Sequence, residues 1–192
     1  MIGGSESKIR EEAARSLSPE RWRHTLGVAA TAEELALIHG ADPDLARVAG
    51  LLHDYAREMA PEELQRLATA KGLEIDPIEA REPLLLHGKV GAMLAYERFG
   101  LAHPDLLAAI AQHITGAPGM TLLASVVFLA DFIEPGRRDD VCAHARSAAR
   151  SDLRRALLLA LDATMHYVIT RGYFLHPRSV AARNELLDPG MQ

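Results

Sequence analysis

The chain has 192 residues, of which 48% are hydrophobic and 24% are charged, as expected for a soluble globular protein with a sizeable core. Its net charge of -5 argues against a general nucleic-acid or membrane-surface binder, so we expect small molecules as partners. Cys142 is the only cysteine, which excludes an internal disulfide and makes the cytoplasm the default location.

The N-terminal residues 1–17 form a polar or helical lead-in. They lack the apolar core that an export signal requires, so we expect them to stay on the protein. The longest apolar run, residues 122–130, is interrupted only by Ser125 and is too short to span a bilayer. It predicts a buried helix.

Two helix starts stand out near the beginning of the chain. Residues 18–20, Ser-Pro-Glu, supply a cap, a proline for the first turn and an acid near the positive end of the helix dipole. This helix is expected to run to about His39, with His24 on its mostly apolar face. Residues 42–44, Asp-Pro-Asp, open a second helix whose inward stripe includes His53.

The remaining pattern is also helical. Helices are expected from Pro61 to Lys71, around His87 up to Gly100, from Pro104 to near Gly116, from Met120 past Asp131, from Ser151 to Arg171, and as a short piece within 173–187. No segment alternates as strands do. The predicted fold class is therefore all-α, with one helical domain over residues 18–187 and a tail at 188–192.

Four imidazoles and two carboxylates stand out in these helices, and nearly all of them fall on the apolar side, where polar side chains need a partner. They are His24, His53, Asp54, His87, His113 and Asp131. Asp54 lies next to Gly50, whose small size would let a neighbouring helix or a ligand approach. Neutral imidazole nitrogen and carboxylate oxygen together suit divalent iron, manganese or zinc, so the set predicts a metal site inside a bundle.

A single inward histidine is more often a hydrogen-bonded core residue than a metal ligand. Several together are harder to explain in that way, and burying Asp131 unpaired after an apolar run would cost several kcal/mol or force its protonation. His39, His103, His144 and His166 show no such convergence. We assign those four to surfaces, helix ends or core hydrogen bonds.

The flanking residues carry a family resemblance. The chain resembles the HD-domain phosphohydrolases, and within them the bacterial symmetrical bis(5'-nucleosyl)-tetraphosphatase branch, the YqeK-like proteins. The matching stretches are Arg23–Val28, Ala49–Asp54, Leu86–Ala92, His113–Gly116 followed by Met120, Leu129–Arg137, His176–Pro177 and Ala182–Asn184.

The resemblance implies a helical bundle with a di-metal centre in its interior. The two divalent ions are commonly iron, with manganese or other divalent ions as alternatives. In this scheme His24, His53, Asp54 and Asp131 hold the first ion, His87 and His113 hold the second, and Asp54 bridges both. A metal-bridging hydroxide would then cleave diadenosine tetraphosphate symmetrically into two molecules of ADP.

The resemblance also points to residues that would contact the nucleotide. Asp54, Arg137 and Lys89 are the expected catalytic residues, because a guanidinium and an ammonium neutralise charge on phosphoryl oxygens. Gly88 would permit close approach of a phosphate, and Tyr173 and His176 would border the nucleotide together with Lys89 and Arg137.

Three positions depart from the branch pattern, and four readings of the activity stay open. Ile114, Phe132 and Arg57 replace a usual threonine, tyrosine and lysine, which puts rate and substrate preference in more doubt than metal binding. The alternatives to the tetraphosphatase are a phosphohydrolase for another nucleotide or phosphate ester, a di-iron oxygenase, and a regulatory module without catalysis. Whether the chain forms a homodimer is also open.

Overall fold

The computed structural model describes residues 6–188, and this part of the chain contains helices and turns but no strand. The α-helices are α1 (Glu6–Ser16), α2 (Pro19–His39), α3 (Pro43–Leu52), α4 (Pro61–Ala70), α5 (His87–Phe99), α6 (Pro104–Gln112), α7 (Leu122–Ile133), α8 (Asp140–Ala149), α9 (Leu153–Thr170) and α10 (Pro177–Leu187), and a 3-10 helix, η1 (Pro83–Leu86), leads into α5. The all-α prediction is confirmed.

The two predicted helix starts near the beginning of the chain are confirmed by their caps. The Ser18 hydroxyl accepts a hydrogen bond from the Arg21 backbone N–H, and the Asp42 carboxylate accepts bonds from the N–H groups of Asp44 and Leu45. A proline follows each cap, where its missing N–H removes no helical hydrogen bond. Gly40 then ends α2 in the left-handed conformation, with φ of 81°.

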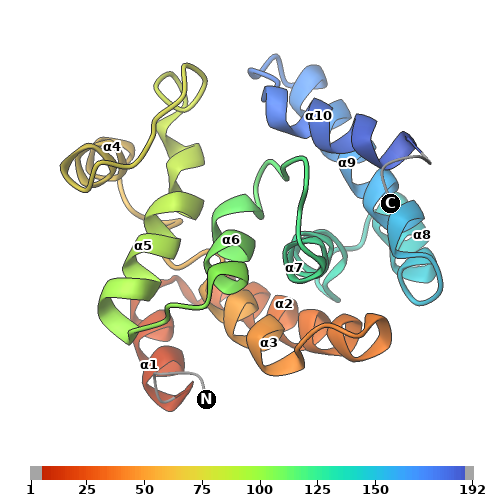
Figure 1. Ribbon diagram of the computed structural model, residues 1–192, viewed down its shortest axis with the longest axis horizontal. Coiled ribbons are helices and arrows are strands. Elements are labelled where there is room, and N and C mark those ends of the chain that lie inside the picture. The colour runs from red at the N-terminus through yellow and green to blue at the C-terminus, as the bar shows by residue number, and fades with distance from the viewer. Residues whose placement is uncertain (1–5, 189–192) are drawn as a thin grey trace.

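Helix α7 lies at the centre of the bundle. It contacts α2, α3 and α6 on one side and α8 and α9 on the other, and Figure 1 shows it seen nearly end-on between these groups. All residues from Leu123 to Ala130 are buried, which confirms the prediction for this apolar run. Among the helices of residues 6–188, none has a stretch long and apolar enough to cross a bilayer.

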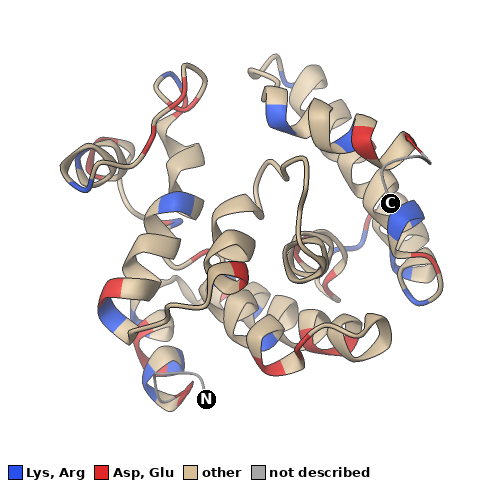
Figure 2. Ribbon diagram, in the orientation of Figure 1, with Lys and Arg blue, Asp and Glu red and all other residues tan. Residues whose placement is uncertain are grey.

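Charged side chains are scattered over the outer helices. Figure 2 shows both signs on most of them and no single basic face, in agreement with the low net charge. The helix α1, which falls within the expected lead-in of residues 1–17, buries Ile9 and Ala13 completely. Residues 1–5 of that lead-in, and the tail after Asp188, lie outside the described residues.

Several helix bounds differ from the sequence prediction, and most differences fall at the site. Helix α3 stops at Leu52 and α6 stops at Gln112, so His53 and His113 are C-cap residues and Asp54 lies in the following turn. Met120 precedes α7, which begins at Leu122. At the ends of α3 and α6, the histidine side chain bonds a carbonyl group of the last turn, as described below.

Helix α8 was not predicted from the sequence. Its buried residues, Cys142, Ala145 and Ala149, are small, so they make only a weak apolar stripe between polar neighbours. The helix nevertheless packs closely along α9. Burial against a partner helix therefore stabilises α8 more than its own pattern suggests.

Gly50 permits the close packing of α3 on α2. A Cβ atom at this position would lie 2.7 Å from Ala29 Cα and 3.0 Å from Ala29 N, which are backbone atoms that cannot move aside. The sequence had suggested that Gly50 lets a neighbouring helix or a ligand approach, and the neighbour is α2.

We therefore expect Gly50→Ala to lower the free energy of unfolding by about 1–3 kcal/mol, because overpacking forces the two helices apart. Urea denaturation measures the change. Gly91→Ala is the matched control, because its Cβ would lie 3.5 Å from the Ile110 side chain in ordinary contact, and alanine favours a helix. Equal stability of the two variants would contradict this account of the α2–α3 contact.

Candidate metal centre

The six residues singled out from the sequence meet in one place between α2, α3, α5, α6 and α7. His53, Asp54, His87 and His113 are buried, and the side chains of His24 and Asp131 are 12% and 24% exposed. His24 and Asp131 lie within α2 and α7, whereas the other four lie at helix ends or in the turn after α3. Residues from both halves of the chain thus contribute to one interior cluster.

Asp54 occupies the middle of this cluster, with its two oxygens turned toward different histidines. Its Oδ1 lies 3.2 Å from His87 Nε2 and 3.5 Å from His113 Nε2. Its Oδ2 lies 3.4 Å from His53 Nε2 and 3.9 Å from His24 Nε2. A carboxylate placed in this way can offer one oxygen to each of two cations.

Asp131 supplies a second carboxylate on the Oδ2 side of Asp54. Its Oδ1 lies 3.0 Å from His24 Nε2 and 4.0 Å from His53 Nε2. Two overlapping groups therefore have ligand atoms all within 4.8 Å of one another: His24, His53 and Asp131 form one, and His53, Asp54 and His113 form the other. Nitrogen and carboxylate ligands at this spacing suit a divalent transition metal.

Three of the imidazoles are oriented by the same local hydrogen bond. His53 Nδ1 lies 2.7 Å from Gly50 O, His87 Nδ1 lies 2.6 Å from Leu84 O, and His113 Nδ1 lies 2.7 Å from Ile110 O. In each case the acceptor is the carbonyl three residues earlier, and Leu84 O also accepts the His87 backbone N–H. A carbonyl only accepts, so Nδ1 carries a hydrogen and Nε2 is directed toward the centre.

His24 reaches the same tautomer by a different contact. Its Nδ1 lies 3.2 Å from Glu134 Oε1, and the other carboxylate oxygen accepts a hydrogen bond of 2.6 Å from Gly136 N. A Cβ at Gly27 or Gly136 would lie 2.6 or 2.7 Å from a Glu134 oxygen, so the carboxylate fits only because both neighbours are glycines. Glu134 was missed from the sequence, although it stands within the matching stretch 129–137.

The charge and hydrogen bonding of the cluster fit a bound cation. His24 Nε2 and His53 Nε2 are buried and have no hydrogen-bond partner, and the short contact of His24 with Asp131 lacks hydrogen-bond geometry. Burial by itself would lower the pKa of His53, but the Asp54 carboxylate outweighs it and raises this pKa to about 9. The carboxylates thus favour positive charge at His53, whose Nε2 has no hydrogen-bond partner.

His87 and the two carboxylates are in the states that ligands require. Burial lowers the pKa of His87 to about 4, so its imidazole is neutral at neutral pH. Burial would raise the pKa values of Asp54 and Asp131, but the surrounding imidazoles lower both below the usual range of an aspartate. Both carboxylates are therefore ionised.

Two arginines contact the carboxylates from outside the histidine cluster. Arg21 Nη1 donates a hydrogen bond of 2.9 Å to Asp54 Oδ2, and Arg137 Nη2 donates one of 3.3 Å to Asp131 Oδ1. Their side chains are 32% and 45% exposed, so each guanidinium lies at the border between the centre and solvent. Arg137 had been expected near the substrate, whereas Arg21 was missed.

Gly88 and Lys89, two residues expected to contact the nucleotide, already have protein neighbours. A Cβ at Gly88 would lie 2.8 Å from Ala111 O, so its small size allows α5 to pack on α6. The Lys89 ammonium donates to Glu79 Oε2 at 2.7 Å and to Glu74 O at 2.8 Å. No nucleotide contact is needed to explain either residue.

His176 and Tyr173 lie on the C-terminal part of the chain. His176 Nε2 lies 2.8 Å from Asp76 Oδ2, and Asp76, Glu79 and His176 form a third group of potential metal ligands. Burial would raise the pKa of Asp76, but the Glu79 N–H and the His176 imidazole lower it to about 2. Each of the three side chains has hydrogen-bond partners, so the group fastens α10 to the 76–79 turn. Tyr173 is 56% exposed.

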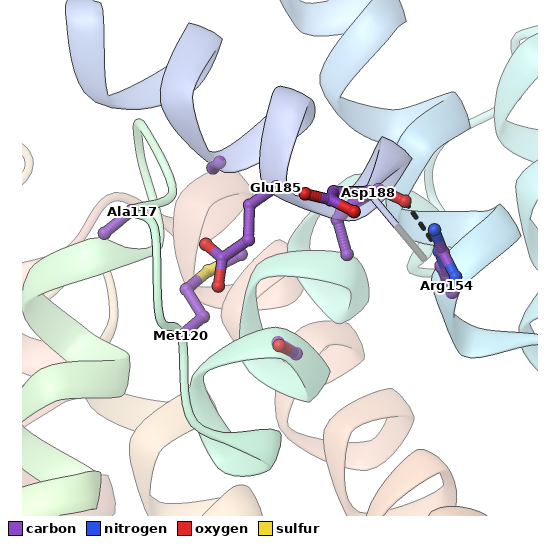
Figure 3. Close-up of a pocket in the computed structure, with 8 residues that line it drawn as sticks. Ala117, Met120, Arg154, Glu185 and Asp188 are labelled. Carbon is purple, nitrogen blue, oxygen red and sulfur yellow. Dashed lines mark hydrogen bonds between the residues drawn. The ribbon is translucent and has the colours of Figure 1, made fainter. Parts of the chain in front are cut away.

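Two pockets differ in their volume and in their position relative to the centre. The larger, about 700 Å³, borders the centre and is lined by Ser18, Glu20, Arg21, Arg23, His24, Gly27, Glu58, Glu134, Pro135, Gly136 and Arg137. The smaller, about 130 Å³, lies between α9, α10 and the loop before α7, with Ala117, Met120, Arg154, Glu185 and Asp188 around it (Figure 3). None of the six candidate ligands lines this smaller pocket.

Comparison with known proteins gives consistent matches. The HD domain model matches residues 21–136. Proteins named bis(5'-nucleosyl)-tetraphosphatase, symmetrical, are similar over nearly their whole length: that of Halalkalibacterium halodurans is 36% identical over 89% of this chain and 91% of its own, and that of Bacillus subtilis is 35% identical over 93% and 98%. A crystal structure from Clostridium acetobutylicum, described as an HD superfamily hydrolase involved in NAD metabolism, has a TM-score of 0.92 and 40% identity over 95% of this chain and 97% of that one.

The contact of Glu134 with His24 yields a test of the centre. We expect Glu134→Gln to weaken the binding of manganese about 10- to 100-fold, because the partner behind a metal-binding imidazole fixes its orientation and raises its basicity. Metal content after dialysis and a competition titration measure the change. Glu97→Gln, which removes an exposed carboxylate bonded to Lys71, is the control. Unchanged affinity in Glu134→Gln would contradict the assigned role.

Proposed function

Because this chain belongs to the HD-domain family, we propose that it hydrolyses dinucleoside tetraphosphates, such as diadenosine tetraphosphate, in the middle of the phosphate chain to give two nucleoside diphosphates. The relatives whose names carry this activity match nearly the full chain, which supports the same reaction here. The observation that carries the proposal is the position of Asp54, with one oxygen facing each half of the histidine set.

We propose His24, His53, Asp54 and Asp131 as ligands of one divalent cation, and Asp54, His87 and His113 as ligands of a second. Iron is our choice of metal, with manganese as the alternative. Two such cations, when bound, lower the pKa of a water molecule so that it becomes a nucleophile near neutral pH, and they polarise phosphoryl oxygens. The four Nε2 atoms and the two ionised carboxylates lie close enough together to serve as ligands of such cations.

The reaction needs little further acid or base from the protein. The oxygen of a water molecule bonds to an inner phosphorus and its proton passes to solvent, while the bridging P–O bond to the other inner phosphate breaks and the electron pair leaves with that oxygen. A nucleoside diphosphate departs as a stable anion, because a terminal phosphate has a second pKa of about 6. The remaining task is to offset negative charge on the phosphoryl oxygens, for which Arg137 is suitably placed beside Asp131.

Hydrolysis of another nucleotide is the second candidate. The Clostridium acetobutylicum relative is described as involved in NAD metabolism, which favours a dinucleotide with a shorter phosphate bridge as the competing substrate. A substrate panel that includes NAD, nucleoside triphosphates and diadenosine tri- and tetraphosphate separates the two. A higher kcat/KM for any substrate other than the tetraphosphate would favour the second candidate.

We expect the manganese-loaded protein to convert diadenosine tetraphosphate into ADP alone, as measured by chromatography of the products. Asp54→Asn should lower kcat at least about 10³-fold, because loss of the shared carboxylate removes several kcal/mol of metal-derived stabilisation of the transition state. Asp105→Asn, which makes the same change in the first turn of α6, should leave the rate unchanged. The appearance of AMP together with ATP would contradict symmetrical cleavage.

Arg137→Ala should lower kcat/KM about 10- to 100-fold while metal content stays the same, because Arg137 acts on the phosphate and is not a metal ligand. Arg138→Ala is the matched control, since Arg138 is the adjacent arginine and does not line the larger pocket. Initial rates and metal analysis of the same preparations provide both measurements. Equal rates for the two variants would contradict the role of Arg137.

A further inference from the structure

The larger pocket lies over the first turns of α2, and the metal centre forms part of its wall. His24 lines the pocket directly, and Arg21 and Arg137 line it while they contact Asp54 and Asp131. Its volume of about 700 Å³ is within the range of roughly 300–1,000 Å³ for small-molecule sites. A ligand here would have one end at the reacting centre.

Helix geometry places two arginines on opposite edges of the pocket floor. Glu20, His24 and Gly27 share one face of α2, because residues separated by three, four or seven positions lie on the same side of a helix. Arg21 and Arg23 flank that face and are separated by roughly 160° around the helix axis. Between them, the Glu134 carboxylate lies against Gly27.

Arg23 differs from the other two arginines of this pocket in the contacts of its side chain. Arg21 and Arg137 are bonded to Asp54 and Asp131, whereas the Arg23 guanidinium makes no hydrogen bond or ion pair with any residue of the described segment 6–188. Its side chain is exposed while it lines the pocket. A guanidinium in this position is available to an anion from solution.

No acidic residue that lines the pocket forms an ion pair with Arg23 within the described segment. Glu58 accepts hydrogen bonds of 2.7 Å from Ser18 N and 2.6 Å from Ser18 Oγ, and Glu134 is held by Gly136 and His24. Glu20, three residues before Arg23, makes no ion pair with it among the described residues. The Arg23 guanidinium is therefore free to bind an anion that enters the pocket.

We propose that this pocket binds one nucleoside diphosphate half of the substrate and retains it as product after cleavage, with Arg23 contacting the phosphate nearer the nucleoside and Arg21 the phosphate nearer the metal centre. The inference rests on the proposed function, and it assigns the substrate to the side of the centre formed by His24 and Asp131. The guanidinium fork of Arg23 matches two phosphate oxygens, which an amide side chain cannot neutralise.

The test is the affinity for ADP, measured by titration calorimetry with the manganese-loaded full chain. We expect Arg23→Gln to weaken ADP binding about tenfold, which corresponds to about 1.4 kcal/mol, with unchanged metal content and melting temperature. In turnover of diadenosine tetraphosphate, its KM should rise more than its kcat falls. Arg66→Gln, at an exposed arginine of α4, is the matched control and should bind ADP like the wild type.

The outcomes separate this proposal from the proposed function. Unchanged ADP affinity in Arg23→Gln, a wild type that does not bind ADP, or a parallel loss of metal in Arg23→Gln would each overturn the pocket assignment. If Arg23→Gln loses ADP affinity as expected but the wild type does not cleave diadenosine tetraphosphate, the pocket assignment stands and only the substrate proposal fails.

Discussion

The centre depends on hydrogen bonds between histidine side chains and nearby backbone carbonyl groups. His53, His87 and His113 each satisfy the carbonyl three residues earlier, at the ends of α3, η1 and α6. This bond fixes the tautomer and directs the other nitrogen inward. The ends of α3 and α6 coincide with the orientation of His53 and His113, because in each case the histidine after the last helical residue bonds a carbonyl of the final turn.

This arrangement is electrostatically unfavourable when no cation is bound. Two ionised carboxylates lie among four imidazoles whose inward nitrogen atoms face one another, and His87 Nε2 is only 3.1 Å from His113 Nε2. Without a cation, the carboxylates raise the pKa of His53 to about 9, so that a proton occupies its Nε2 at neutral pH. Glu134 adds a third negative charge behind His24. The same features that strain the cluster strengthen its attraction for divalent cations.

The sequence predicted the composition of the centre better than its geometry. The apolar periodicity of α2 placed His24 inward, and the all-α class followed from the caps and stripes. The periodicity could not show that α3 and α6 stop at their histidines, because the competing side-chain bonds are local details that no hydrophobic pattern records. Glu134 and Arg21 were missed for another reason: their partners lie 110 and 33 residues away along the chain. The pairing of Glu134 with Gly27 and Gly136 could have been suspected only from the glycines that make room for it.

Helix α2 links the metal centre to the nucleotide pocket. It places His24 in the metal centre, and it places Arg21 and Arg23 at the two edges of the pocket floor. Arg21 is shared between the two sites, because its guanidinium contacts Asp54 while it lines the pocket. A cation bound to Asp54 would compete with Arg21 for Oδ2, and the guanidinium would then be available to phosphate. By thermodynamic linkage, a nucleoside diphosphate that engages Arg21 would strengthen metal binding by the same factor as the metal strengthens nucleotide binding. Under the proposed function, one side chain would therefore couple the two sites without a change of fold.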